Sequence, residues 1–168
     1  MALIVETGAI IAGADSYVSV TNCDTYHAAR GNAAWTGMDA VKEAALRKAA
    51  AYLDGHYRNR WKGRKVEPTI QDLEWPRYDV CVSEAGPFFL DSDVIPRRVK
   101  DAQCELALIA LSADLAPSVA AGIKREKIDV LETEYFAGVP VGTTVYTAVN
   151  NLLSDFITPK QSRDAVRG

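Results

Sequence analysis

The chain has few of the residues that build metal centres and disulfide frameworks. Its 168 residues include three cysteines and two histidines. Cys23, Cys81 and Cys104 are widely separated and form no CxxC pair, which argues against both a disulfide scaffold and a thiolate zinc site. Neither His27 nor His56 has a second histidine or cysteine at helical spacing. The sequence therefore predicts no metal site and no cofactor.

Long apolar runs and an excess of positive charge are also lacking. The longest apolar run, residues 106–111, is far shorter than the roughly 20 residues that a membrane-spanning helix needs. The N-terminus has no basic stretch typical of a signal peptide. Nineteen basic residues against 22 acidic ones give a net charge of −3, so no global positive field draws the chain onto nucleic acid. We expect a protein of a reducing compartment that functions away from membranes, with any DNA contact confined to a local surface.

Motifs that carry catalysis are missing as well. There is no GxSxG elbow, HExxH helix, EF-hand loop or GxGxxG turn. Residues 138–144 are similar to a phosphate-binding loop but lack its lysine and are one residue short. Asp24 lies three residues before His27, where a hydrogen bond on a helix surface is a simpler interpretation than a general base. The sequence thus predicts that the protein is not an enzyme.

Helical periodicity is the strongest positive signal. Apolar residues recur at steps of three and four in residues 40–61, 96–116 and 144–156, after a shorter helix predicted over 22–30 with Thr21 as its cap. Residues 16–20 and 123–136 alternate as strands do. The expected fold is mainly α, a small bundle of three to four helices with a short β arm or hairpin and extended termini. We expect one domain over residues 1–157, with an extended segment at 1–20, and a flexible tail over 158–168.

The segment 63–95 has no periodicity and is interrupted by prolines, which predicts a long ordered loop with a small hairpin around 80–89. Within it, Trp75 precedes Pro76 and is therefore held in an extended conformation. Its ring could pack within its own chain or anchor a neighbouring subunit, and the sequence does not separate these alternatives.

The strongest local concentration of charge follows the second long helix. Five cations fall within eight residues, with Tyr57 and Trp61 interleaved: Arg58, Arg60, Lys62, Arg64 and Lys65. This pattern suits single-stranded nucleic acid, since phosphates attract the cations and bases stack on the rings. Alternatively, the cations lie where a helix dipole favours them, and Trp61 completes a buried stripe. The sequence favours the second interpretation and leaves the first open.

Several short segments, in their order and spacing, resemble a family of tailed-phage structural proteins. They are 15–18, 26–32, 52–54, 61–63, 73–77, 95–96, 105–107 and 134–136, which read DSYV, YHAARGN, YLD, WKG, LEWPR, IP, ELA and EYF. The resemblance extends from about residue 14 to 156. Family members are catalogued as DnaT-like single-stranded-DNA-binding proteins, yet in helix order they are similar to head–tail connector adaptors.

The resemblance implies a structural virion protein at the head–tail interface, assembled in the host cytoplasm. It would form a closed ring of about twelve copies, contacting the portal protein and a tail-side connector, stopper or tail tube protein, with genomic DNA passing through the lumen without sequence-specific binding. Predicted contact residues are Trp75, Pro76, Arg77, Tyr135, Phe136, Lys160, Arg163 and Arg167. The alternative is a single-stranded-DNA-binding protein of phage replication, in which Arg58, Arg60, Lys62, Arg64 and Lys65 face the nucleic acid and Tyr57 and Trp61 are exposed.

Overall fold

The computed structural model describes residues 2–82, 88–117, 126–128, 131–133 and 146–158. Four helices dominate them: α1 (Val20–Ala28), α2 (Asp39–Tyr57), α3 (Arg97–Ala110) and α4 (Thr147–Leu153). Three two-stranded antiparallel pairs join β1 (Arg64–Lys65) to β2 (Arg77–Tyr78), β3 (Cys81–Val82) to β4 (Phe88–Phe89), and β5 (Glu126–Ile128) to β6 (Leu131–Thr133). The predicted class, mainly α with a short β arm, is confirmed.

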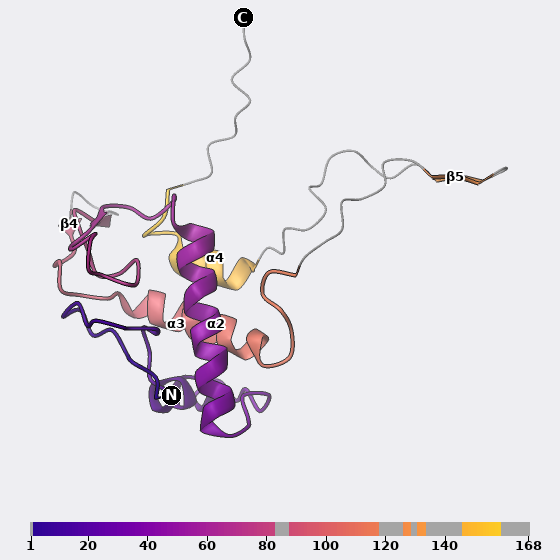
Figure 1. Ribbon diagram of the computed structural model, residues 1–168, viewed down its shortest axis with the longest axis horizontal. Helices are drawn as coiled ribbons and strands as arrows, with labels where there is room; N and C mark the ends of the chain where they lie inside the picture. Colours follow the sequence, from indigo (N-terminus) through magenta and orange to yellow (C-terminus); the bar gives the residue numbers. More distant parts are fainter. Residues whose placement is uncertain (1, 83–87, 118–125, 129–130, 134–145, 159–168) are drawn as a thin grey trace, which may run out of the picture.

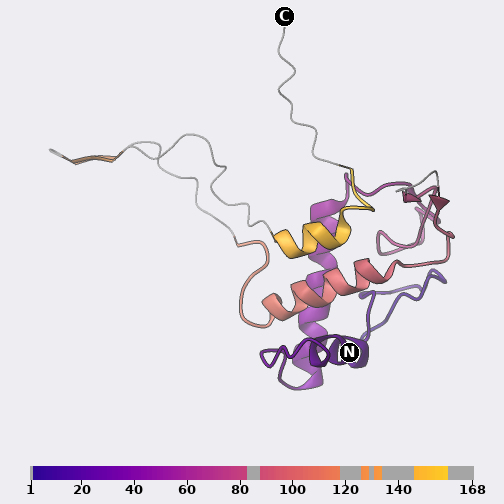
Figure 2. The same ribbon diagram turned by 180° about the vertical axis from the view of Figure 1, so that it is seen from behind.

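The long helix α2 crosses α3 and α4, which lie beside each other against it, and α1 lies near the N-terminal end of α2 (Figures 1 and 2). Its alanine-rich sequence explains the close contact, because small side chains let the helix backbones approach each other. Leu46, Ala49, Ala50, Leu53 and Tyr57 form the predicted stripe and are all buried. Burial of this apolar stripe against α3 stabilises the packing of the helices through the hydrophobic effect.

A buried glutamine ties the N-terminal segment to this helical core. The Gln103 amide on α3 donates to Ser16 Oγ at 2.8 Å and to the Leu46 carbonyl at 2.9 Å, and its oxygen accepts from Tyr17 N–H at 2.9 Å. Both the nitrogen and the oxygen of the Gln103 amide are thus hydrogen-bonded within the chain, as a fully buried amide requires. Three segments distant in sequence are fixed relative to one another by one side chain.

The N-terminal segment folds back on itself before α1. The Glu6 carboxylate is buried and accepts backbone N–H groups of Gly8, Ile10 and Ile11. Gly8 has φ +112°, and a Cβ at this position would lie 1.7 Å from the Asp93 carbonyl oxygen. Only glycine fits such a close approach of two backbones.

Several boundaries differ from the sequence prediction. The strand expected over 16–20 is wrong, since Ser16 makes an isolated bridge to Val5 and Val20 already begins α1. The cap of α1 is Ser19, whose hydroxyl accepts from Asn22 N–H, and not Thr21. Helix α2 ends at Tyr57 rather than Trp61, and the chain then tightens into a turn in which Arg60 N–H donates to the Tyr57 carbonyl three residues back, at 2.8 Å.

The later elements agree better with their predictions. The hairpin expected around 80–89 is present as β3–β4, and the arm expected over 123–136 contains β5–β6. Helix α3 spans Arg97–Ala110 where the sequence predicts 96–116, with Pro96 as its N-cap, and α4 spans Thr147–Leu153 where the sequence predicts 144–156. The tail predicted over 158–168 lies outside the described residues after Thr158. No helix among the described residues combines the length and hydropathy that a bilayer crossing requires.

Candidate nucleic-acid interface

The basic segment Arg58–Lys65 leaves the end of α2 and runs into β1. Arg58 and Arg64 are its most exposed members, with 74% and 70% of their side chains accessible to solvent. Each keeps one partner inside the chain: Arg58 lies 3.8 Å from Glu74, and Arg64 contacts Asp79 at 2.9 Å. The Arg64 guanidinium also lies over the ring of Tyr78, 4.8 Å from its centroid.

The other three cations are held by backbone carbonyls. Arg60 Nε donates to the Thr158 carbonyl at 3.2 Å, and Lys62 Nζ donates to the Asp155 carbonyl at 2.8 Å. Lys65 Nζ donates to the Gln71 carbonyl at 2.9 Å and lies 3.9 Å from Glu74. Carbonyl oxygens bind cations without neutralising them, so the segment keeps an excess of positive charge. Among the described residues, its ion pairs reach two carboxylates, Glu74 and Asp79.

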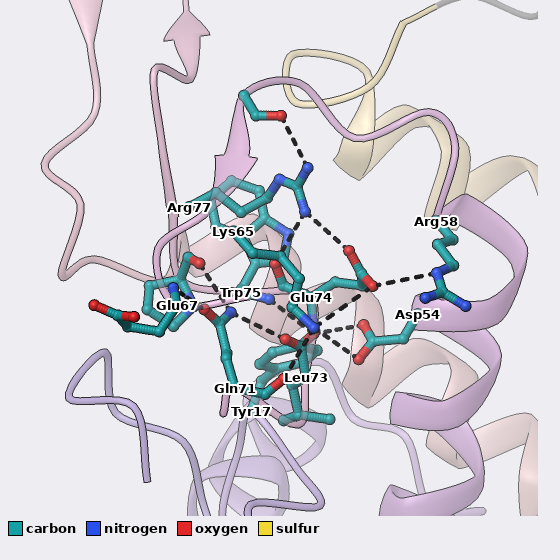
Figure 3. A network of polar contacts seen from close by, with 12 residues as sticks. Tyr17, Asp54, Arg58, Lys65, Glu67, Gln71, Leu73, Glu74, Trp75 and Arg77 are labelled. Carbon is teal, nitrogen blue, oxygen red and sulfur yellow. Dashed lines mark hydrogen bonds and ion pairs between the residues drawn. The ribbon is translucent and has the colours of Figure 1, made fainter. Parts of the chain in front are cut away.

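A buried polar network fixes this segment to the loop that follows it (Figure 3). Glu74 is the centre, accepting from Arg77 Nη1 at 2.9 Å while its own N–H donates to Tyr17 Oη and to Asp54 Oδ2, each at 3.0 Å. The Arg77 guanidinium donates further to the carbonyls of Lys62 and Gly63, at 2.9 Å each. The loop is therefore bonded to the basic segment at several points, which makes the arrangement of its cations a fixed property of the fold.

Asp54 lies deep in this network. Tyr17 Oη donates to its Oδ1 at 2.5 Å, and burial raises its pKa from 3.8 to about 6, against the opposing effect of these hydrogen bonds. Burial also raises the pKa of the Tyr17 hydroxyl, and the adjacent Asp54 charge raises it further. Tyr17 is thus a permanent donor to Asp54 at neutral pH, and the pair links the N-terminal segment to α2 and to the loop.

The aromatic rings that the alternative interpretation would stack on nucleic acid are not available to it. Tyr57 and Trp61 are buried, and the Trp61 ring packs edge-on against Trp75 with 5.6 Å between centroids. Trp75 then packs edge-on against Phe156 at 5.8 Å. The sequence stripe through Trp61 therefore belongs to the core, as the favoured interpretation predicts. The alternative, in which Tyr57 and Trp61 form an exposed stacking platform, is wrong.

Trp75, Pro76 and Arg77, the predicted subunit contacts, are buried as well. Trp75 has no exposed surface and joins the core, so its ring does not reach a neighbouring molecule from this position. The Arg77 guanidinium donates to Glu74 and to the carbonyls of Lys62 and Gly63. Of the other predicted contact residues, Tyr135, Phe136, Lys160, Arg163 and Arg167 lie outside the described residues.

Exposed aromatic rings are found instead on the hairpin β3–β4. Phe88 and Phe89 are 65% and 55% exposed. This hairpin directly follows β2, and Lys62 Nζ lies 3.4 Å from the Cys81 carbonyl of β3. The structure thus brings the end of the basic segment beside a hairpin that carries two solvent-facing rings. Sequence reasoning placed the hairpin correctly but gave its phenylalanines no role.

The surroundings of His27 do not suit a general base. It is buried, its Nε2–H donates to the Cys104 carbonyl at 3.1 Å, and its Nδ1 accepts from the Asn32 amide at 3.0 Å. Burial lowers its pKa, which favours this neutral form. The hydrogen bond expected from Asp24 is wrong, since Asp24 contacts Trp35 Nε1 and Lys42 Nζ. The described residues contain no group of three metal-ligating side chains.

The family model described as "Putative DnaT-like ssDNA binding protein" matches residues 1–168. The chain belongs to this DnaT-like family. No curated protein and no solved structure matches it significantly. The match confirms the DnaT-like part of the resemblance, and the head–tail connector role stays a prediction.

The structure explains the role of one motif in this DnaT-like protein. The LEWPR segment, residues 73–77, is the most informative motif of the sequence because it builds the network that positions the basic segment. Its residues are buried by their contacts within the chain. In this chain the motif stabilises the fold, whereas the candidate binding groups lie around it.

Proposed function

We propose that this DnaT-like protein binds single-stranded DNA and that the basic segment Arg58–Lys65 meets the phosphate backbone. The observation that carries the proposal is the exposure of Arg58 and Arg64 on a positively charged segment. Hydrogen bonds from the loop around Glu74 and Arg77 fix the backbone of this segment. A chain with a net charge of −3 otherwise has no general affinity for a polyanion. Membership of a family named for single-stranded DNA binding supports the same function.

The geometry suggests how such a surface would work. Phosphates would approach the outer faces of Arg58 and Arg64, whose inner partners Glu74 and Asp79 hold the guanidinium groups in place. Because Arg77 holds the backbone of this segment through the carbonyls of Lys62 and Gly63, little backbone entropy would be lost on binding. Contacts of this kind are to phosphates, so we expect the same affinity for different base sequences and a strong dependence on salt.

The test measures the affinity of the protein for a fluorescent oligo-dT by anisotropy at several salt concentrations. Replacing Arg58 and Arg64 together by alanine should weaken binding and lower the salt slope by about 1.4, since each phosphate contact to a single strand contributes about 0.7. The matched control is Arg30→Ala with Lys48→Ala, which removes the same charge from exposed positions elsewhere. Equal loss of affinity in both double variants would show that only net charge matters and would refute the proposed surface.

We propose a second candidate function, the head–tail connector that the sequence resemblance implies. A separate observation supports it. Exposed apolar side chains occur at several separate places. Among them are Met38 and Val41 at the start of α2, and Phe88 and Phe89 on β3–β4. In both ribbon views these places lie toward opposite ends of α2 (Figures 1 and 2). A head-to-tail contact between copies of one chain requires two different, complementary surfaces, and such contacts form a ring where the rotation between neighbouring copies closes.

A further inference from the structure

A surface hollow lies between the hairpin β3–β4 and the start of α3. Its volume is about 500 Å³. Leu90, Pro96 and Phe156 contribute apolar surface to it, and the latter two are buried, so they form its floor. Three exposed side chains, Phe88, Arg97 and Arg98, stand around this floor. An apolar floor bordered by a ring and two guanidinium groups is chemically unlike an ordinary gap between side chains.

The charge at the edge of the hollow is positive. Arg98 is paired with Asp155, but Arg97 has 87% of its side chain exposed and reaches Asp101 only at 3.7 Å. Both arginines open α3, whose first turn holds no acidic residue and has no side-chain cap. The start of a helix carries the positive end of its dipole, which adds to the arginine charges. An anionic partner is therefore favoured there.

The hollow is continuous with the basic segment. Lys62 Nζ donates to the carbonyl of Asp155, which lines the hollow, and contacts the carbonyl of Cys81 on β3. Arg60 is bonded to the carbonyl of Thr158, three residues beyond Asp155. A strand whose phosphates follow the basic segment would thus reach the hollow by way of Lys62.

We propose that this hollow takes a nucleobase of single-stranded DNA, with the base against the Phe88 ring and a neighbouring phosphate at Arg97. The inference rests on the single-stranded-DNA binding proposed above and adds a stacking site to its phosphate contacts. The volume is ample for one planar base, and stacking on an aromatic ring is available to every base because each has a π-face. This site would provide the base stacking that Tyr57 and Trp61 cannot provide, because both rings are buried in the core.

The hairpin provides its own control. Phe88 pairs with Val82 and Phe89 with Cys81, so the two neighbouring rings point to opposite faces of the hairpin. Phe88 lines the hollow, together with its partner Val82. The variants Phe88→Ala and Phe89→Ala therefore remove the same group from adjacent, similarly exposed positions, and only the first should matter for a base in the hollow.

The experiment compares the affinity of the full chain for oligo-dT with that for an abasic oligomer of the same length. The wild type should prefer oligo-dT, and Phe88→Ala should lose about tenfold in affinity for it while binding the abasic oligomer as before. Arg97→Ala should weaken binding of both probes and lower the salt slope. Phe88→Leu, which keeps an apolar side chain without a ring, should lose the preference in the same way, with unchanged circular dichroism.

The outcomes separate the two proposals. If Phe88→Ala keeps the preference for oligo-dT, or if Phe89→Ala loses it equally, the stacking site is wrong, whereas an effect of Arg58 and Arg64 would still support DNA binding. If the wild type binds neither probe, the proposed function fails and the stacking site fails with it.

Discussion

Trp75 illustrates at the scale of one residue how a conspicuous side chain can be misassigned. An aromatic residue before proline in a long loop is a reasonable candidate for a contact with another subunit. The structure places it instead between Trp61 and Phe156, with no exposed surface. Its indole N–H has no hydrogen-bond partner among the described residues. The role of Trp75 is therefore to fill volume, and polar recognition is not part of it.

This role predicts different effects for two substitutions of Trp75. Trp75→Ala should lower the free energy of unfolding by about 3–5 kcal/mol, the usual cost of truncating a large buried ring. Trp75→Phe should cost much less, because a ring remains and an unpaired N–H is removed from the core. Urea denaturation followed by circular dichroism measures both. A Trp75→Ala variant as stable as the wild type would contradict the core position.

The basic segment and the loop that packs beneath it form one unit at the scale of elements. Residues 63–80 contain little secondary structure beyond β1 and β2, yet Glu74, Gln71 and Arg77 supply the hydrogen bonds that a longer sheet would provide. Asp54 joins this unit to α2. The helix and the loop should therefore share a dependence on the protonation of that carboxyl.

The pKa of Asp54 sets the sign of this dependence. Burial raises it to about 6 in the folded protein, so between pH 4 and 6 the folded state holds a proton that the unfolded state has lost. The contribution of Asp54 to stability is thus highest below pH 4 and falls as the pH rises through this window. The shift of about two units corresponds to at most about 3 kcal/mol.

Asp54→Asn removes this titration. We expect the stability of the wild type relative to Asp54→Asn to decrease from pH 4 to 7, measured by urea denaturation at a series of pH values. The lowered pKa of His27 changes stability in both proteins alike and cancels in the difference. Asp79→Asn, which removes an exposed carboxylate from the same loop, is the control. A relative stability that rises with pH would show that Asp54 is ionised more readily in the folded state.

The two proposed functions differ at the scale of the whole molecule. A DNA-binding protein of replication acts in the infected cell, whereas a connector is a stoichiometric part of the virion. The exposed apolar side chains at the start of α2 and on β3–β4 suit assembly, and the basic segment suits DNA. Both functions involve contact with DNA, so binding measurements alone do not separate them.

Quantitative mass spectrometry of purified particles separates them. For the connector we expect a ratio close to one between copies of this chain and copies of the portal subunit, because stacked rings of a head–tail joint have comparable subunit numbers. For the replication protein we expect the chain in infected cells and not in particles. Absence from the particles would therefore refute the connector.

The sequence by itself determined the helical class, the approximate positions of the four helices and the hairpin at 80–89. These features depend on local periodicity and capping, which neighbouring residues express without help from the rest of the chain. It also determined the family, through the order of short motifs. The charge of the segment 58–65 was equally plain from composition.

Only the tertiary structure decided which of these residues face solvent. Trp75 fits exposed and buried roles equally well in sequence, and periodicity only favours burial of Tyr57 and Trp61. The packing of these rings depends on Phe156, which is distant along the chain. The exposed rings of Phe88 and Phe89, the partners of each cation and the hollow beside α3 likewise arise from contacts between remote segments. Burial is a property of the assembled core, so no local pattern specifies it fully.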